Sequence, residues 1–100
     1  NLIINSYINY HYNFNNKIMN IIYTTHWCSY CVAAKNFFEK HKIQYKEINI
    51  EESNISREQL QEIAGSYTVP QIFINDKCIG GYDSLLKMYQ NNELESIINE

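Results

Sequence analysis

The sequence predicts an α/β fold in which a mixed sheet of four strands is flanked by helices. Short apolar runs rich in β-branched and aromatic residues alternate with longer segments whose apolar residues recur at helical spacing. The first two runs are separated by one such helical segment, so their strands are expected to be parallel with a right-handed crossover. The last two runs are separated by only two residues, which predicts an antiparallel hairpin. At 100 residues, the chain is expected to form one domain with a single core.

The four strands follow from runs rich in β-branched and aromatic residues. We expect them at residues 20–24, 45–50, 71–74 and 77–79. Ile48 and Ile50 of the second strand should share one side of the sheet, because side chains alternate along a strand. Asn75-Asp76 favours a tight turn between the last two strands.

The first two helices carry clear apolar stripes. The first helix is expected at about residues 28–41, and the second begins at Ser56, which forms a capping box with Gln59, and ends at Gly65. The predicted core-facing residues are Ala34, Phe37, Phe38 and His41 in the first helix, and Leu60, Ile63, Ala64 and Tyr67 in the second.

Two further helices follow a break at Gly80-Gly81. The stripe of the third helix consists of Tyr82, Leu85, Leu86 and Tyr89, and a short last helix contains Leu94, Ile97 and Ile98. Asn92, with Glu95 three residues later, resembles a cap for that last helix.

The first eighteen residues differ in composition from the rest. They are rich in Asn and Tyr, contain no acidic residue, and have their first lysine at Lys17. They lack the basic start of a secretory signal and the arginines of a transit peptide. We expect residues 1–18 to be a disordered or non-native extension and the domain to span residues 19–100; an additional strand within residues 2–8 is the alternative.

Composition narrows the classes of function. The formal net charge is -3, and the absence of a Lys/Arg cluster disfavours nucleic acid or an anionic membrane as partner. No apolar run approaches the roughly 20 residues of a membrane span. Three cysteines are too few for a disulfide framework, and their odd number disfavours secretion. A reducing compartment, the cytoplasm, is expected.

Cys28 and Cys31 are the residues with the clearest chemistry. They form a C-x-x-C motif between a predicted strand and a predicted helix, the pattern of a thioredoxin-type redox pair. At a helix N-terminus, unpaired N–H groups and the helix dipole favour a thiolate, which lowers a cysteine pKa from about 8.5 toward roughly 3.5–7.5. Cys31, one turn later, is then placed to attack a mixed disulfide formed on Cys28.

A zinc site is the main alternative use of such a pair. Structural zinc usually needs four ligands. Beyond the pair the chain offers Cys78 and three histidines without H-x3-5-H spacing, so we expect no metal site. A purely structural short-loop disulfide is a further alternative.

Three motifs together resemble those of the dithiol glutaredoxins. They are Cys28-Ser29-Tyr30-Cys31, Thr68-Val69-Pro70 and Gly80-Gly81-Tyr82-Asp83, in the order and spacing of that family, and the resemblance extends from about Met19 to the C-terminus. It implies a thioredoxin-like fold. It also implies glutathione-dependent reduction of protein disulfides and of protein–glutathione mixed disulfides, by a monomer that uses glutathione as co-substrate.

The resemblance further implies a role for each cysteine. Cys28 would be the nucleophile that takes glutathione from a protein thiol, and a second glutathione would then resolve it. Cys31 would act when the substrate is a protein disulfide.

The glutathione site implied by the resemblance surrounds Cys28. Pro70 would be a cis proline, and the backbone of Val69, after Thr68, would pair with glutathione as an added strand. On frequency alone a trans proline would be expected.

The remaining implied contacts lie elsewhere in the chain. Gly81, Tyr82 and Asp83 would hold the γ-glutamyl end at a helix N-terminus, where a plain N-cap is the alternative. Tyr30 would flank the glutathione thiol. Arg57 would bind the glycyl carboxylate; the alternative is a solvated surface arginine.

This chain departs from the family pattern near the nucleophile. Thr25 occupies the position at which members usually carry a carboxylate-binding lysine, so Arg57 is expected to contribute more. Ser29 replaces the usual proline, and Trp27 replaces Thr or Ser; Trp27 would shield the thiolate, shape the substrate groove or simply pack. His26, if protonated, would favour the Cys28 thiolate; a solvent-exposed histidine without a role is the alternative.

Other functions stay open at the level of sequence. A thioredoxin is disfavoured by Tyr30 and by the Gly80–Asp83 motif. Serine at position 29 keeps a glutathione-ligated [2Fe–2S] cluster, bridging two protomers through Cys28, as a minority role. A non-catalytic domain is disfavoured because both cysteines are present. Cys78 is expected to be a buried small apolar residue, with a regulatory thiol as the alternative.

Overall fold

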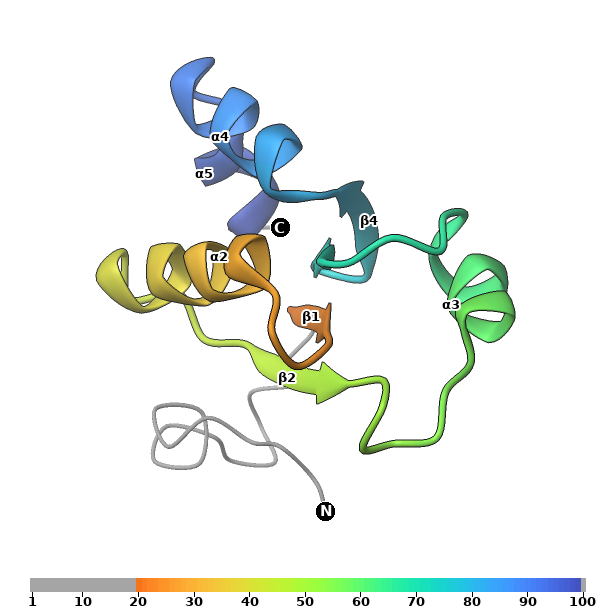
Figure 1. The fold of residues 1–100 in the computed structure, drawn as a ribbon. Helices are drawn as coiled ribbons and strands as arrows, with labels where there is room; N and C mark the ends of the chain where they lie inside the picture. Colours follow the sequence, from red (N-terminus) through yellow and green to blue (C-terminus); the bar gives the residue numbers. More distant parts are fainter. Residues whose placement is uncertain (1–19, 100) are drawn as a thin grey trace, which may run out of the picture.

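The computed structural model describes residues 20–99, so the expectation for residues 1–18 lies outside the described residues. A four-stranded sheet runs through the centre of this region, in the order β2-β1-β3-β4, with helices on both faces (Figure 1). The predicted α/β architecture is confirmed. Among residues 20–99, no helix is both long and apolar enough to cross a membrane.

The sheet is mixed, as predicted. β1 (Ile21–Thr24) is parallel to β2 (Lys46–Asn49) and antiparallel to β3 (Gln71–Ile74). β3 and β4 (Lys77–Gly80) form the antiparallel hairpin, with a register shift between Ile72 and Phe73. The turn at Asn75-Asp76 takes positive φ angles of 49° and 68°, which Asn and Asp tolerate better than most residues.

The helices begin and end close to the predicted positions. They are α2 (Ser29–Lys40), α3 (Arg57–Ala64), α4 (Tyr82–Gln90) and α5 (Leu94–Ile98). Ser56 and Gln59 form the predicted capping box of α3, and Gly65 ends that helix in the left-handed conformation with φ 82°.

Apolar side chains form one layer on each face of the sheet. Ile22 of β1 and Ile72 of β3 pack with Phe38 of α2 and Leu85 of α4 on one face. The neighbouring strand residues point to the other face, because side chains alternate, and they pack with Leu60 of α3. The expected single core is therefore two layers separated by the sheet. Ile48 and Ile50 do share one of them, as predicted.

Part of the predicted apolar stripe of α3 is wrong. Leu60 is fully buried and Ala64 packs beside it, but Ile63 and Tyr67 are exposed. The reason is that α3 has only eight residues and covers its sheet face alone, so only a narrow strip of the helix meets the sheet.

The predicted cap at Asn92 is also wrong. Asn92 has φ 61° and ends α4, while Glu93 is the N-cap of α5 and no side chain caps that helix. The N–H of Glu93 donates to the carbonyl of Met88 (2.8 Å) and the N–H of Asn92 to that of Tyr89 (3.2 Å). This is the Schellman pattern of a helix C-terminus, for which asparagine is the usual substitute for glycine.

Candidate active site

Cys28 is the N-cap residue of α2 and ends the loop that connects β1 to this helix. Its backbone is extended (φ −122°, ψ 104°), and its sulfur accepts a hydrogen bond from the N–H of Cys31 at 3.1 Å. The two cysteines form a disulfide, with their Cα atoms 5.2 Å apart. Cys31 is buried with 1% of its surface exposed, whereas Cys28 is partly exposed. Of these two cysteines, only Cys28 is therefore accessible to a substrate in solution.

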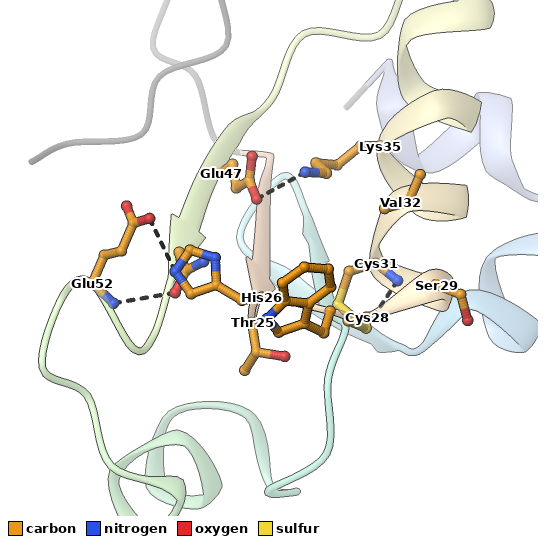
Figure 2. Close-up of a pocket in the computed structure, with 11 residues that line it drawn as sticks. Thr25, His26, Cys28, Ser29, Cys31, Val32, Lys35, Glu47 and Glu52 are labelled. Carbon is orange, nitrogen blue, oxygen red and sulfur yellow. Dashed lines mark hydrogen bonds and ion pairs between the residues drawn. A yellow bond between two sulfur atoms is a disulfide. The ribbon is translucent and has the colours of Figure 1, made fainter.

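The loop before Cys28 is held by two acidic side chains. The backbone N–H of His26 donates to Oε1 of Glu51 at 3.0 Å, and Nε2 of His26 lies 3.2 Å from Oε2 of Glu52 (Figure 2). Trp27 follows with φ 57° and a fully exposed side chain. Of the three roles considered for Trp27, packing in the fold is wrong.

The Thr68-Val69-Pro70 segment passes directly beside the nucleophile. The Val69–Pro70 bond is cis, as the resemblance implied, and the carbonyl oxygen of Val69 lies 4.0 Å from Sγ of Cys28. The buried Gln71 holds the segment: its Nε2 donates to the carbonyl and to Oγ1 of Thr68 at 3.0 and 3.1 Å. An extended ligand on Val69 would thus lie against the Cys28 sulfur.

The N-terminus of α4 lies on the same side. Gly81 is its N-cap without a side-chain cap, and Asp83 is exposed in the first turn. A Cβ atom built on Gly81 would lie 3.6 Å from the carbonyl oxygen of Pro70, so the two segments are neighbours. The rings of Tyr30 and Tyr82 are 6.2 Å apart, which brings α2 and α4 together beside Cys28.

Arg57 sits at the first position of α3. Its side chain is exposed, and Nη1 donates to the carbonyl of Tyr67 at 2.7 Å. Tyr67 immediately precedes Thr68, so the guanidinium supports the chain that leads to the cis proline. The side chain is exposed as well as hydrogen-bonded, so a solvated surface arginine and a carboxylate-binding arginine both fit this position.

A groove of about 670 Å³ opens on the other side of Cys28, toward β2 (Figure 2). Inside it, Glu47 accepts from Oγ1 of the buried Thr24 (2.7 Å) and from Nζ of Lys35 (3.1 Å). Sequence reasoning missed Lys35, Glu47 and Glu52, because isolated charged residues on a helix, strand and loop carry no motif; only the tertiary fold brings them together.

The expectation that Cys78 is buried is wrong. Its side chain is exposed on β4, the outer strand of the sheet, with Sγ 3.5 Å from the carbonyl oxygen of Ala64 and 3.8 Å from Oε1 of Gln71. β4 is an edge strand, so few neighbours cover it, and α3 reaches Cys78 only with the carbonyl of its last residue, Ala64. Within residues 20–99, no group of three or more His, Cys, Asp or Glu side chains is arranged to hold a metal ion.

Comparison with known proteins identifies the family. The family model described as "Glutaredoxin" matches residues 20–79, which include Cys28, Cys31 and the cis-proline segment. The chain belongs to the glutaredoxin family.

Individual relatives agree with this assignment. The glutaredoxin of Pseudomonas aeruginosa is 35% identical over 79 residues, covering 79% of this chain and 94% of that protein. Glutaredoxin 1 of Rickettsia typhi is 37% identical over 82 residues, covering 78% and 77%. The crystal structure of a buckwheat glutaredoxin–glutathione complex superposes with a TM-score of 0.72 at 25% identity, covering 80% and 76%.

This glutaredoxin therefore has the thioredoxin-like fold and is a glutathione-dependent thiol-disulfide oxidoreductase of the dithiol type. Its C-x-x-C pair is the redox centre. The three motifs that carried the resemblance come from distant parts of the chain and are neighbours in the fold.

Proposed function

We propose that Cys28 is the nucleophile of this glutaredoxin and that it removes glutathione from glutathionylated proteins. The single observation that carries this proposal is the position of its sulfur: partly exposed, at a helix N-terminus, and accepting the Cys31 N–H at 3.1 Å. An N–H group and the positive end of a helix dipole both stabilise a thiolate over a thiol.

The reaction proceeds by two exchanges at glutathione sulfur. The Cys28 thiolate attacks that sulfur, the protein–glutathione S–S bond breaks, and the protein thiolate leaves and takes a proton from solvent. A second glutathione, as its thiolate, then attacks the same sulfur. The Cys28–glutathione bond breaks, oxidised glutathione departs, and the Cys28 thiolate is restored.

Protein disulfides require Cys31 as well. The Cys28 thiolate attacks one sulfur of the substrate disulfide and releases the other as a thiol. Cys31 loses its proton and attacks the Cys28 sulfur, which frees the reduced protein and leaves the Cys28–Cys31 disulfide present in the structure. Two glutathione molecules return the pair to dithiol and leave as oxidised glutathione.

Glutathione is proposed to lie along the cis-proline segment. Its cysteinyl unit would pair with the backbone of Val69, after Thr68 and before Pro70, because the Val69 carbonyl oxygen is 4.0 Å from the nucleophile. Its γ-glutamyl carboxylate would meet the N–H groups of the uncapped N-terminus of α4, at Gly81 and Tyr82.

Side chains complete the proposed site. The Asp83 carboxylate would take the γ-glutamyl ammonium, and Tyr30, whose ring neighbours Tyr82, would flank the bound thiol. Arg57 would take the glycyl carboxylate, since it reaches the carbonyl of Tyr67 and so lies beside the start of the segment.

Arg57→Ala is expected to raise the glutathione KM several-fold and to leave kcat nearly unchanged, because it removes one charge contact to the bound tripeptide; an exposed ion pair is worth about 0.2–1 kcal/mol. Steady-state kinetics with a small glutathione mixed disulfide measure both constants. Arg57→Lys, which keeps the charge and loses the two-pronged geometry, should fall between. An unchanged KM in both variants would remove Arg57 from the site.

We propose that the folded domain begins near Met19 and that residues 1–18 are an extension. The start of the family match at residue 20 supports this boundary. Deleting residues 1–18 is expected to change the free energy of unfolding by less than about 0.5 kcal/mol, which shifts the melting temperature of a domain of this size by no more than about 4 °C. Activity should be retained. A large fall in melting temperature would contradict the proposal.

A [2Fe–2S] cluster remains a second, minor candidate. The C-x-x-C pair offers one accessible thiolate per chain, Cys28, because Cys31 is buried. A four-thiolate cluster would therefore need two chains and two glutathione thiols, which exposed Ser29, in place of a rigid proline, leaves room for. Anaerobic reconstitution with iron, sulfide and glutathione decides: no visible absorption band and no dimer would eliminate this role.

We propose that the protein acts as a monomer in the cytoplasm. A free exposed thiol at Cys78 supports a reducing compartment, because such a thiol would oxidise readily elsewhere. Sedimentation of the reduced protein without iron tests the first part: a dimer would contradict it. A tagged copy found outside the cytoplasm would contradict the second.

A further inference from the structure

We propose that the groove on the β2 side of Cys28 binds a positively charged segment of the substrate protein. Trp27 and Glu52 would recognise a lysine or arginine close to the target cysteine. This inference rests on the proposed function, since it concerns which glutathionylated proteins reach the Cys28 thiolate.

The groove meets the proposed glutathione site at Cys28 and extends from there toward β2. Its lining comes from the loop before Cys28, from α2, and from β2 with the loop that follows it (Figure 2). It includes Trp27, Val32, Lys35 and Glu52, but no residue of the cis-proline segment or of α4. A substrate protein is wider than a tripeptide, so it must cover this side of Cys28 whenever its cysteine meets the nucleophile.

The charges of the groove favour a cation. Lys35 and Glu47 neutralise each other through their 3.1 Å contact. With histidine counted as neutral, Glu52, which contacts the ring of His26, leaves one uncompensated carboxylate in the groove. Glu51 does not line the groove, but it accepts from the N–H of the lining residue His26 and adds a second carboxylate next to it.

The two sides of Cys28 consequently differ in charge. Thr25 lines the groove and contributes no positive charge, where the family resemblance expected a lysine. On the other side lie the Arg57 guanidinium and the N-terminus of α4, whose dipole is positive. An anion such as glutathione is favoured on the second side, and a cationic peptide segment on the first.

Trp27 supplies an apolar face in the same groove as Glu52. The indole is fully exposed, and Trp27 has the left-handed φ of 57°, which a bulky residue seldom adopts. Packing within the fold therefore does not explain this residue. The face of an indole is the strongest aromatic partner for a cation, and a nearby carboxylate adds an ion pair. A lysine or arginine side chain can lay its aliphatic part and its charge against the indole and can pair that charge with the carboxylate.

The test compares two synthetic glutathionylated peptides of equal length, one with lysines and one with glutamates beside the cysteine. For the wild-type protein at low salt, kcat/KM should be about three- to tenfold higher for the lysine peptide. At about 1 M salt, where the Debye length is about 3 Å, the ratio should approach one. Trp27→Ala and the double variant E51Q/E52Q should each reduce the low-salt ratio at least twofold.

The control double variant E93Q/E95Q removes the same charge at α5 and is expected to keep the wild-type ratio. Equal kcat/KM for the two peptides in the wild type would overturn the inference. So would a control that loses the preference as fully as E51Q/E52Q, because overall charge would then be the cause. A loss in Trp27→Ala that is the same for both peptides would also overturn it.

A small mixed disulfide of glutathione without a peptide separates the two proposals. If the wild type reduces it but shows no preference between peptides, the groove inference fails and the proposed function stands. If the wild type does not reduce it, the proposed function itself fails.

Discussion

Cys28→Ser is expected to lower the reduction of a small glutathione mixed disulfide to the uncatalysed rate. A serine hydroxyl stays protonated at neutral pH even at a helix N-terminus, so no nucleophile would remain. Cys31→Ser should retain this activity, because a second glutathione resolves the mixed disulfide, but it should lose the reduction of a protein disulfide through the dithiol route. A glutathione-coupled assay measures the rate of each of the two variants with each of the two substrates.

Cys78→Ser is the matched control for these variants. It removes a thiol that lies on β4, outside the C-x-x-C pair, and both activities should be kept. Full activity of Cys28→Ser, or loss of all activity in Cys31→Ser, would show that the assigned order of the two thiols is wrong. Titration of the reduced protein adds an independent check, because Cys28 should ionise below neutral pH.

Phe38→Ala is expected to cause the largest loss of stability. Phe38 is completely buried, and its ring packs edge-to-face against that of Tyr45, with the ring centroids 5.4 Å apart. Truncation of such a residue costs about 3–5 kcal/mol, because it loses apolar burial and leaves a cavity. In a domain of this size, each kcal/mol lowers the melting temperature by roughly 4–8 °C. Urea and thermal unfolding, followed by circular dichroism, measure the loss.

Two controls accompany this measurement. Phe38→Leu keeps most of the volume and should cost less than the alanine variant. Ile63→Ala removes an apolar side chain that is 44% exposed on α3, and should cost under about 1 kcal/mol. A Phe38→Ala variant as stable as Ile63→Ala would contradict the assignment of Phe38 to the core.

Local sequence patterns predicted the structure correctly where it depends only on residues close by in the sequence. The capping box of Ser56 and Gln59, the left-handed end at Gly65 and the turn at Asn75-Asp76 were predicted and are confirmed, because each is built within a few residues. The prediction that Asn92 caps the last helix was wrong because asparagine is common both at the start and just after the end of helices. In this chain, asparagine at position 92 closes α4 with its left-handed backbone.

Burial was less predictable than secondary structure. Helical spacing indicated which side of α3 is apolar, but not how much of that side the sheet covers, and Ile63 and Tyr67 are exposed. Cys78 was expected to be buried and is exposed, because its strand is at the edge of the sheet and strand order is a tertiary property.

The sequence by itself determined the fold class, the redox pair and its place at the start of α2, because strand and helix periodicity and the C-x-x-C spacing are properties of short segments. The tertiary structure decided what surrounds Cys28. It placed Val69, Gly81 and Arg57 toward one side of the sulfur. It placed the groove lined by Trp27, Lys35, Glu47 and Glu52 on the other side. These residues are far apart along the chain, and only the parallel crossover and the packing of helices on the sheet bring them together.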